Sequence, residues 1–221
     1  MPHRATRTKP VERIDFVEAL VADLRAVVPA PDLARVLTVW ALVGLGTTAA
    51  WILVLGGLRE TALADLATPR LALELLLGGA TLAVLARAAL EAGVPGGPSR
   101  RRLLAPVLLM AGLWLAVALG GLPLHGPDAS MAGKRAHCFL EGLAIAALPA
   151  GVGLRMIRRR SLRAGPLAGG LIGLAAGLLP ALAMQLACLY DPSHALRFHF
   201  TPMLVAAGVF GLLGALRSGD D

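Results

Sequence analysis

Six long apolar runs dominate this 221-residue sequence and limit the folds open to it. A helix needs about 20 mainly apolar residues to cross the hydrocarbon core of a bilayer. The runs cover, with approximate ends, residues 36–57, 71–90, 103–122, 138–157, 166–187 and 200–216. Clusters of proline and glycine separate most of these runs, and only isolated prolines lie inside them. The sequence therefore predicts an all-α fold, a six-span transmembrane helix bundle.

The composition agrees with a membrane protein. The chain is 57% hydrophobic and 16% charged, with a mean hydropathy of +0.72, whereas soluble domains carry roughly 25% charged residues. A formal net charge of +7 raises the question of nucleic-acid binding. However, the basic residues lie in clusters between the apolar runs, where the positive-inside rule would place them. We therefore expect no direct contact with nucleic acid.

The distribution of Lys and Arg predicts the orientation. Counted on alternate sides of six spans, 16 of the 21 basic residues fall on the side of the two termini and of the second and fourth connections. Only five fall on the other side. Cytoplasmic loops carry the excess of positive charge in membrane proteins. We therefore predict that both termini are cytoplasmic, with residues 1–34 forming a cytoplasmic segment and residues 35–221 forming the membrane domain.

The cytoplasmic segment contains one amphipathic helix, predicted at about residues 12–28. Its apolar residues recur at steps of three and four, which places them on one face. Between residues 11 and 28 it has four acidic residues and two basic ones, and anionic lipid repels acidic side chains. This balance favours a protein partner over the bilayer interface. The residues expected to form or flank the contact face are Ile14, Asp15, Phe16, Val17, Leu20, Val21, Asp23, Leu24 and Val28.

The fifth run carries a stripe of small residues. Glycines recur at every fourth position, Gly165, Gly169, Gly173 and Gly177, and so lie along one side of a helix. Such a stripe lets another helix backbone approach closely. Two interpretations stay open: tight packing inside the bundle, or a seam between two copies of the chain in a homodimer.

The two cysteines fall at matching depths in this topology. Cys138 starts the fourth span and Cys188 follows the fifth, so both lie at the outer membrane face. Around them, Glu141 lies one helical turn after Cys138, His137 precedes it, and Glu74 begins the second span at the same depth. Carboxylates in apolar spans are functional candidates, and two thiols beside such groups suit a soft metal ion.

Three states of the thiols are open from the residues alone: two inert buried cysteines, a redox or metal sensor, and a static disulfide. No CxxC motif or close Cys/His spacing points to a permanent zinc site. The histidines of the outer connections, His125, His194 and His199, are expected to be solvated loop residues rather than ligands. We expect the two cysteines to meet.

Three segments of the chain resemble the NrsF-type family of bacterial inner-membrane anti-sigma factors. The first is 15-DFVEALVADLRAVVP-29, with its Ala22-Asp23-Leu24 core. The second begins with Cys138 at the head of the fourth span and continues to the basic 155–163 turn, and the third is the Gly/Ala-rich fifth span with Cys188 at its end. The resemblance covers most of the chain.

The resemblance implies regulation rather than catalysis. It implies that the N-terminal helix binds an extracytoplasmic-function sigma factor at the bacterial inner membrane. It also implies that Cys138 and Cys188 sense a heavy metal or an oxidant, with no resident cofactor and at most a transient metal ion on the two sulfurs. Two other classes of function are alternatives for a six-span chain with two cysteines. A small transporter or permease would need polar groups near mid-membrane, and a membrane thiol oxidoreductase would need a CxxC motif or a second thiol pair.

Overall fold

The computed structural model describes residues 18, 21–22, 31–54, 56–94, 96–120, 122, 134–135, 137–160, 165–188 and 191–216. The chain divides into two units, Met1–Ala30 and Pro31–Asp221. In the first unit, Glu18, Val21 and Ala22 are helical and exposed. The other residues of the predicted partner-binding helix lie outside the described residues: Ile14, Asp15, Phe16, Val17, Leu20, Asp23, Leu24 and Val28.

The second unit contains six helices that are long and apolar enough to cross a membrane, and none of its described residues forms a strand. This arrangement confirms the predicted all-α, six-span fold. Five spans are single helices: α2 (Leu33–Val54), α4 (Pro69–Glu91), α5 (Arg100–Leu119), α6 (Cys138–Arg160) and α7 (Pro166–Ala187). A short helix, α3 (Ala62–Asp65), lies between α2 and α4. The sixth span consists of three consecutive pieces, α8 (Pro192–His194), the π-helix η2 (Ala195–Phe200) and α9 (Thr201–Leu216).

Local sequence explains several helix ends. α4 and α7 have Pro69 and Pro166 at their start, where the fixed φ of proline suits the helix and its missing N–H is not needed. α2 ends at Val54 rather than at residue 57, because Gly56 and Gly57 follow with φ of 110° and 79°, a region that glycine enters readily. α5 starts at residue 100 rather than 103, because its leading arginines are good helix formers.

The sixth span differs most from its predicted range of 200–216. It begins at Pro192 and runs for 25 residues to Leu216. Asp191 caps its start, since the carboxylate accepts a hydrogen bond from the backbone N–H of Ser193 at 2.9 Å. Proline next to this cap then starts the helix. As a consequence, His194 and His199 belong to a helix of the bundle rather than to a loop.

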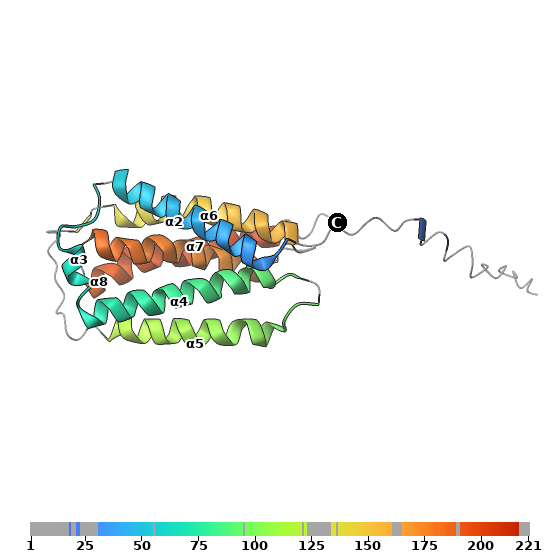
Figure 1. Cartoon of the computed structure of the whole chain (residues 1–221), viewed down its shortest axis with the longest axis horizontal. Coiled ribbons are helices and arrows are strands. Elements are labelled where there is room, and N and C mark those ends of the chain that lie inside the picture. The colour runs from blue at the N-terminus through green and yellow to red at the C-terminus, as the bar shows by residue number, and fades with distance from the viewer. Residues whose placement is uncertain are drawn as a thin grey trace, which may run out of the picture. The chain divides into compact units, whose positions relative to one another are not determined.

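Helix α7 is the centre of the second unit, and it packs against α2, α4, α6 and α9 (Figure 1). Of its most apolar 18-residue window, 72% is buried, against 22% for α5, which lies at the edge against α4. The outward faces are apolar as well, because Leu42, Leu76 and Leu108 are each more than half exposed. Apolar side chains that point outward from every edge of a bundle are what a lipid environment requires.

The glycine stripe of α7 faces α9 of the same chain. A Cβ atom at Gly173 would lie 2.5 Å from the carbonyl oxygen of Ala206, and one at Gly177 would lie 2.5 Å from the Cα of Met203. Gly169 approaches the backbone of Phe210 in the same way. Gly165 precedes the helix with a φ of 49°. The stripe therefore packs inside the bundle, and α9 covers the face that a seam between two copies would use.

Candidate metal and redox site at one end of the bundle

The two cysteines lie together at the end of the bundle where α6 begins and α7 ends, which we call the cysteine end. Cys138 is the first residue of α6 and Cys188 directly follows α7. Their Sγ atoms are 3.1 Å apart, within hydrogen-bonding distance, and are not joined by a disulfide. Both residues are buried, with 1% and 0% of their surface exposed. A small apolar cluster surrounds them: Ile52, Ile145, Met184 and Ala187.

Two histidines of the sixth span join the cysteines. His194 ends α8 and His199 lies in η2, and each is only 4% exposed. One ligand atom from each of Cys138, Cys188, His194 and His199 lies within 4.8 Å of the other three. The expectation that these histidines are solvated loop residues was therefore wrong. Thiol sulfur and imidazole nitrogen together are the donor set that proteins use for zinc and related soft cations.

Backbone carbonyls and basic side chains hold the cysteine end together. The thiol of Cys138 donates to the carbonyl of Arg135 at 3.3 Å, and the guanidinium of Arg59 donates to the carbonyl of Cys188. The side chain of Arg135 in turn donates to the carbonyl of Gly57 at 2.9 Å. These contacts tie the segments before α3 and before α6 to the end of α7. Basic side chains at helix C-termini are favourable because they bond the last free carbonyls.

Basic side chains at the cysteine end pair with acidic ones. Lys134 lies 2.6 Å from Asp191, with exposed side-chain fractions of 2% and 9%. Arg59 lies 2.7 Å from Asp65, and Arg135 lies 3.9 Å from Glu141. The Lys134–Asp191 pair is buried and joins the segment before α6 to the start of the sixth span. It therefore links chain segments that carry three of the four candidate ligands.

The electrostatics at this end act on two groups outside the spans. Burial alone would raise the pKa of Asp191, but hydrogen bonds from Lys134 and Ser193 lower this pKa to about 2. The hydrogen bond between the two sulfurs lowers the pKa of the Cys188 thiol, and His199 lowers it further against the opposing effect of burial. Cys188 is therefore the thiol of the pair that loses its proton more readily.

The other predicted neighbours of the thiols lie outside this four-residue group. His137 is exposed, although it precedes Cys138 in the chain. Glu141 pairs with Arg135 at the rim. Glu74 is 1% exposed and accepts a hydrogen bond from Gln185 Nε2 at 2.9 Å, which links α4 to α7. The roles of all three in sensing stay predictions.

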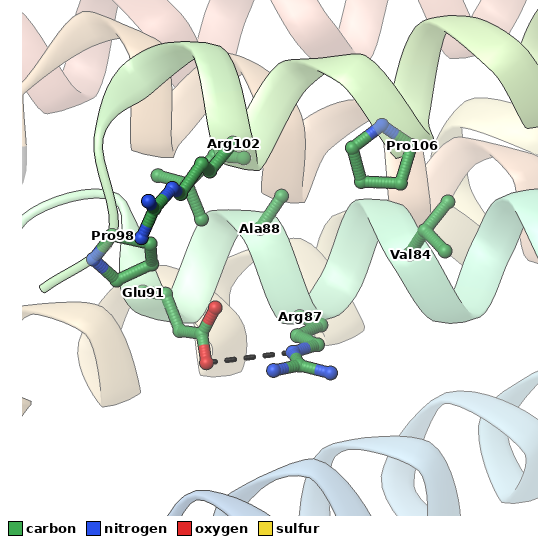
Figure 2. A pocket seen from close by; sticks show the side chains of 8 residues that line it. Val84, Arg87, Ala88, Glu91, Pro98, Arg102 and Pro106 are labelled. Carbon is green, nitrogen blue, oxygen red and sulfur yellow. Dashed lines mark hydrogen bonds and ion pairs between the residues drawn. The ribbon is translucent and has the colours of Figure 1, made fainter.

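Two cavities lie outside the group of two cysteines and two histidines. One, of about 310 Å³, lies at the opposite end of the bundle between the end of α4 and the start of α5. Figure 2 shows Arg87 paired with Glu91 on α4, with Arg102 and Pro106 on α5 across from them. The other, of about 510 Å³, is an almost wholly apolar groove between α2, α4 and α7. Neither contains a thiol or an imidazole among its lining residues.

Comparison with known proteins places the chain in a family. Neither the curated proteins nor the solved structures gave a match. One family model, described as NrsF, negative regulator of sigma F, matches residues 20–217. The match begins within the predicted N-terminal helix and covers all six spans, both cysteines and both buried histidines. The chain therefore belongs to the NrsF family, the negative regulators of sigma F.

Proposed function

We propose that this protein is an anti-sigma factor of the bacterial inner membrane with both termini in the cytoplasm. Its helix at 12–28 holds an extracytoplasmic-function sigma factor and keeps it from core RNA polymerase. A heavy metal or an oxidant that reaches Cys138 and Cys188 causes its release. The observation that carries the sensing part is the 3.1 Å separation of two buried sulfur atoms from different helices.

The charges of the chain support this orientation. Sixteen of the 21 basic residues belong to the side assigned to the cytoplasm. Of the five on the outer side, Arg59 and Arg70 donate to carbonyls at the ends of α7 and α5. These outer arginines are thus explained by helix capping rather than by attraction to a cytoplasmic surface. The cysteine end then faces the compartment that environmental metals and oxidants reach first, and one in which a disulfide persists.

The thiol pair can respond to either signal with a change in geometry. Oxidation removes two electrons and two protons from the two thiols, the electrons pass to the oxidant, and the new S–S bond is about 2.05 Å long. A tetrahedral metal ion with M–S distances of about 2.3 Å instead holds two sulfurs about 3.8 Å apart. The present separation of 3.1 Å lies between these values. Either product therefore displaces the start of α6 against the end of α7.

Release of the sigma factor requires that the signal favour the released state over the holding state. A metal must bind the released state more tightly, or the disulfide must form in it more readily. Because α6 and α7 run the length of the bundle, displacement at the cysteine end can reach the basic turn between them at the other end. The acidic helix at 12–28 is predicted to act on that side of the membrane. A partner for it should present basic residues around an apolar groove.

A reporter for the cognate sigma factor tests the proposal in cells. We expect C138S/C188S to repress the reporter as the wild type does without a signal, and to lose induction by Cd²⁺ or peroxide. The variant E60Q, altered at an exposed residue next to Arg59 at the same end, serves as the matched control and should induce normally. Unchanged induction in C138S/C188S would remove the thiol mechanism and leave the anti-sigma role standing.

Co-purification tests the partner separately. The full-length protein, extracted in detergent, should retain the sigma factor, and V17D/L24D should lose it because aspartate disrupts the apolar face of the predicted helix. E18Q, a change at an exposed helical position, is the control and should retain it. Equal retention by V17D/L24D would show that the sigma factor binds elsewhere.

A further inference from the structure

His194 and His199 are buried histidines with ring nitrogens that lack hydrogen-bond partners of normal geometry and that face the thiol of Cys188. Both imidazoles are 4% exposed. Among the described residues, Nε2 of His194 and both nitrogens of His199 have no hydrogen-bond partner. Leaving a buried polar atom unpaired costs roughly 1–3 kcal/mol of folding free energy. A bound ligand would remove this cost, and unpaired buried atoms are therefore candidate ligand contacts. The two thiols lie within the 4.8 Å that encloses the four ligand atoms.

We propose that Cys138, Cys188, His194 and His199 together form a four-ligand site for one thiophilic divalent cation of the class of Zn²⁺ and Cd²⁺. The consequence of metal binding rests on the proposed function. If that function holds, the inducing signal is a metal ion held by two imidazoles as well as two thiolates. Binding itself is a property of the cysteine end and can be measured without a sigma factor.

The π-helical segment explains how two histidines five residues apart serve one site. In an α-helix with 3.6 residues per turn, such residues point about 140° apart around the axis. A π-helix closes i→i+5 hydrogen bonds and so takes more residues per turn, which brings the two directions closer. The ring centroids of His194 and His199 are 5.1 Å apart. Single π-turns within helices are frequent at functional sites.

The net charge of the loaded site suits its buried position. Each thiol loses one proton on binding the ion, and each imidazole binds as the neutral ring. A dication, two thiolates and two neutral imidazoles sum to zero, so the site needs no further counter-charge inside the bundle. The nearby cations do not compete for the thiolates, because Arg59, Lys134 and Arg135 each pair with a carboxylate.

Binding would also contract the group. In a tetrahedral site with ligand distances of about 2.0–2.3 Å, the ligand atoms lie roughly 3.3–3.8 Å from one another. The four atoms here lie within 4.8 Å, while the two sulfurs are closer than a metal requires, at 3.1 Å. The ion would therefore part the sulfurs slightly and draw the π-helical segment toward them, which links α6, α7 and the sixth span.

Titration of the purified full-length protein in detergent with Cd²⁺, in competition with a chelator, tests the site. We expect one Cd²⁺ per chain, with X-ray absorption showing two sulfur and two nitrogen neighbours. H194A and H199A should each weaken binding by more than tenfold, since loss of even an outer partner of a metal ligand costs roughly 10–100-fold. E60Q, a change at an exposed carboxylate next to Arg59 at the same end, should bind as the wild type does.

Two results would overturn the proposal: wild-type affinity in both H194A and H199A, or a wild-type spectrum with two sulfurs and only oxygen neighbours. Each variant is first compared with the wild type by size-exclusion chromatography and helical circular dichroism. If an alanine variant does not remain folded, H194Q or H199Q takes its place under the same criteria. Sigma-factor retention by the metal-free wild type is measured in parallel, so that failure of the anti-sigma role is recognised independently of metal binding.

Discussion

The Lys134–Asp191 pair offers the sharpest test of what holds the cysteine end closed. Replacing Lys134 with methionine keeps the aliphatic length and leaves Asp191 as a buried, unpaired charge. The pair is almost fully buried, with side-chain exposures of 2% and 9%. Removing one member of a buried pair typically costs roughly 3–5 kcal/mol. We therefore expect K134M to destabilise the contact between the segment before α6 and the start of the sixth span.

The lowered pKa of Asp191 gives a second value for the free energy that the pair contributes to folding. It falls from 3.8 to about 2 in the folded protein, because hydrogen bonds from Lys134 and Ser193 outweigh the effect of burial. At about 1.36 kcal/mol per pKa unit, this shift contributes on the order of 2 kcal/mol at neutral pH. A depressed carboxyl pKa adds stability that is present above the unfolded pKa and is lost as the pH falls through the folded one. The difference between wild type and K134M should therefore shrink below about pH 4.

Labelling of the thiols by a maleimide measures the effect locally. Cys138 and Cys188 are the only cysteines in the chain, and both are buried. Labelling therefore requires this end to open. A loss of about 2–5 kcal/mol raises the population of the open state, and hence the labelling rate, on the order of 30- to 5,000-fold. R101M, which removes an exposed charge at the opposite end, is the control and should leave the rate unchanged.

If the maleimide labels the thiols of K134M as slowly as those of the wild type, the buried pair does not hold the cysteine end closed. The double variant K134M/D191N separates charge from packing. Asparagine retains the cap at the start of the sixth span without a buried charge. It should therefore recover most of the protection lost in K134M. If K134M/D191N labels as fast as K134M, the loss comes from the lysine side chain's packing and not from the uncompensated carboxylate.

Two further changes test the packing of the spans, each by the apparent melting temperature in detergent. G173A should lower it by the equivalent of about 1–3 kcal/mol, because the new methyl group would lie 2.5 Å from the carbonyl oxygen of Ala206. G112A, with open space around it, should not lower it, and a fall as large as that of G173A would contradict the role of the stripe. W40F should lower the free energy of unfolding by about 0.6–1 kcal/mol, because the indole N–H of Trp40 donates to the carbonyl of Pro149 at 2.9 Å. An unchanged melting temperature would show that this hydrogen bond does not stabilise the contact between α2 and α6.

The positions of the two cysteines along the bundle could be predicted from the sequence. Spans that follow one another must cross the membrane in opposite directions, so the start of the fourth and the end of the fifth lie on the same side. Residues 50 apart in the chain are thereby placed at one end. The separation of their sulfurs depends on the helix crossing at that end, which the apolar pattern does not specify. Only the structure provides the 3.1 Å distance.

The histidines could not be assigned in the same way. An apolar pattern with a period of 3.6 residues does not signal a π-helical turn, and Arg197 with His199 lowers the hydropathy where the sixth span begins. The predicted span therefore started at 200, past both ligands. Pro192 and the Asp191 cap were signals of an earlier start. A proline between two apolar runs indicates a break between helices as readily as it indicates the start of one.

The sequence by itself determined the number of spans, their order and the fact that both thiols lie at one end, because bilayer thickness fixes helix length and consecutive spans run in opposite directions. The tertiary structure decided which side chains share that end. It paired Lys134 with Asp191, covered the glycine stripe with α9, and turned His194 and His199 toward Cys138 and Cys188. The physical reason is that hydropathy acts on whole segments, whereas a ligand set depends on the rotation of each helix about its axis, and packing with neighbouring helices sets that rotation.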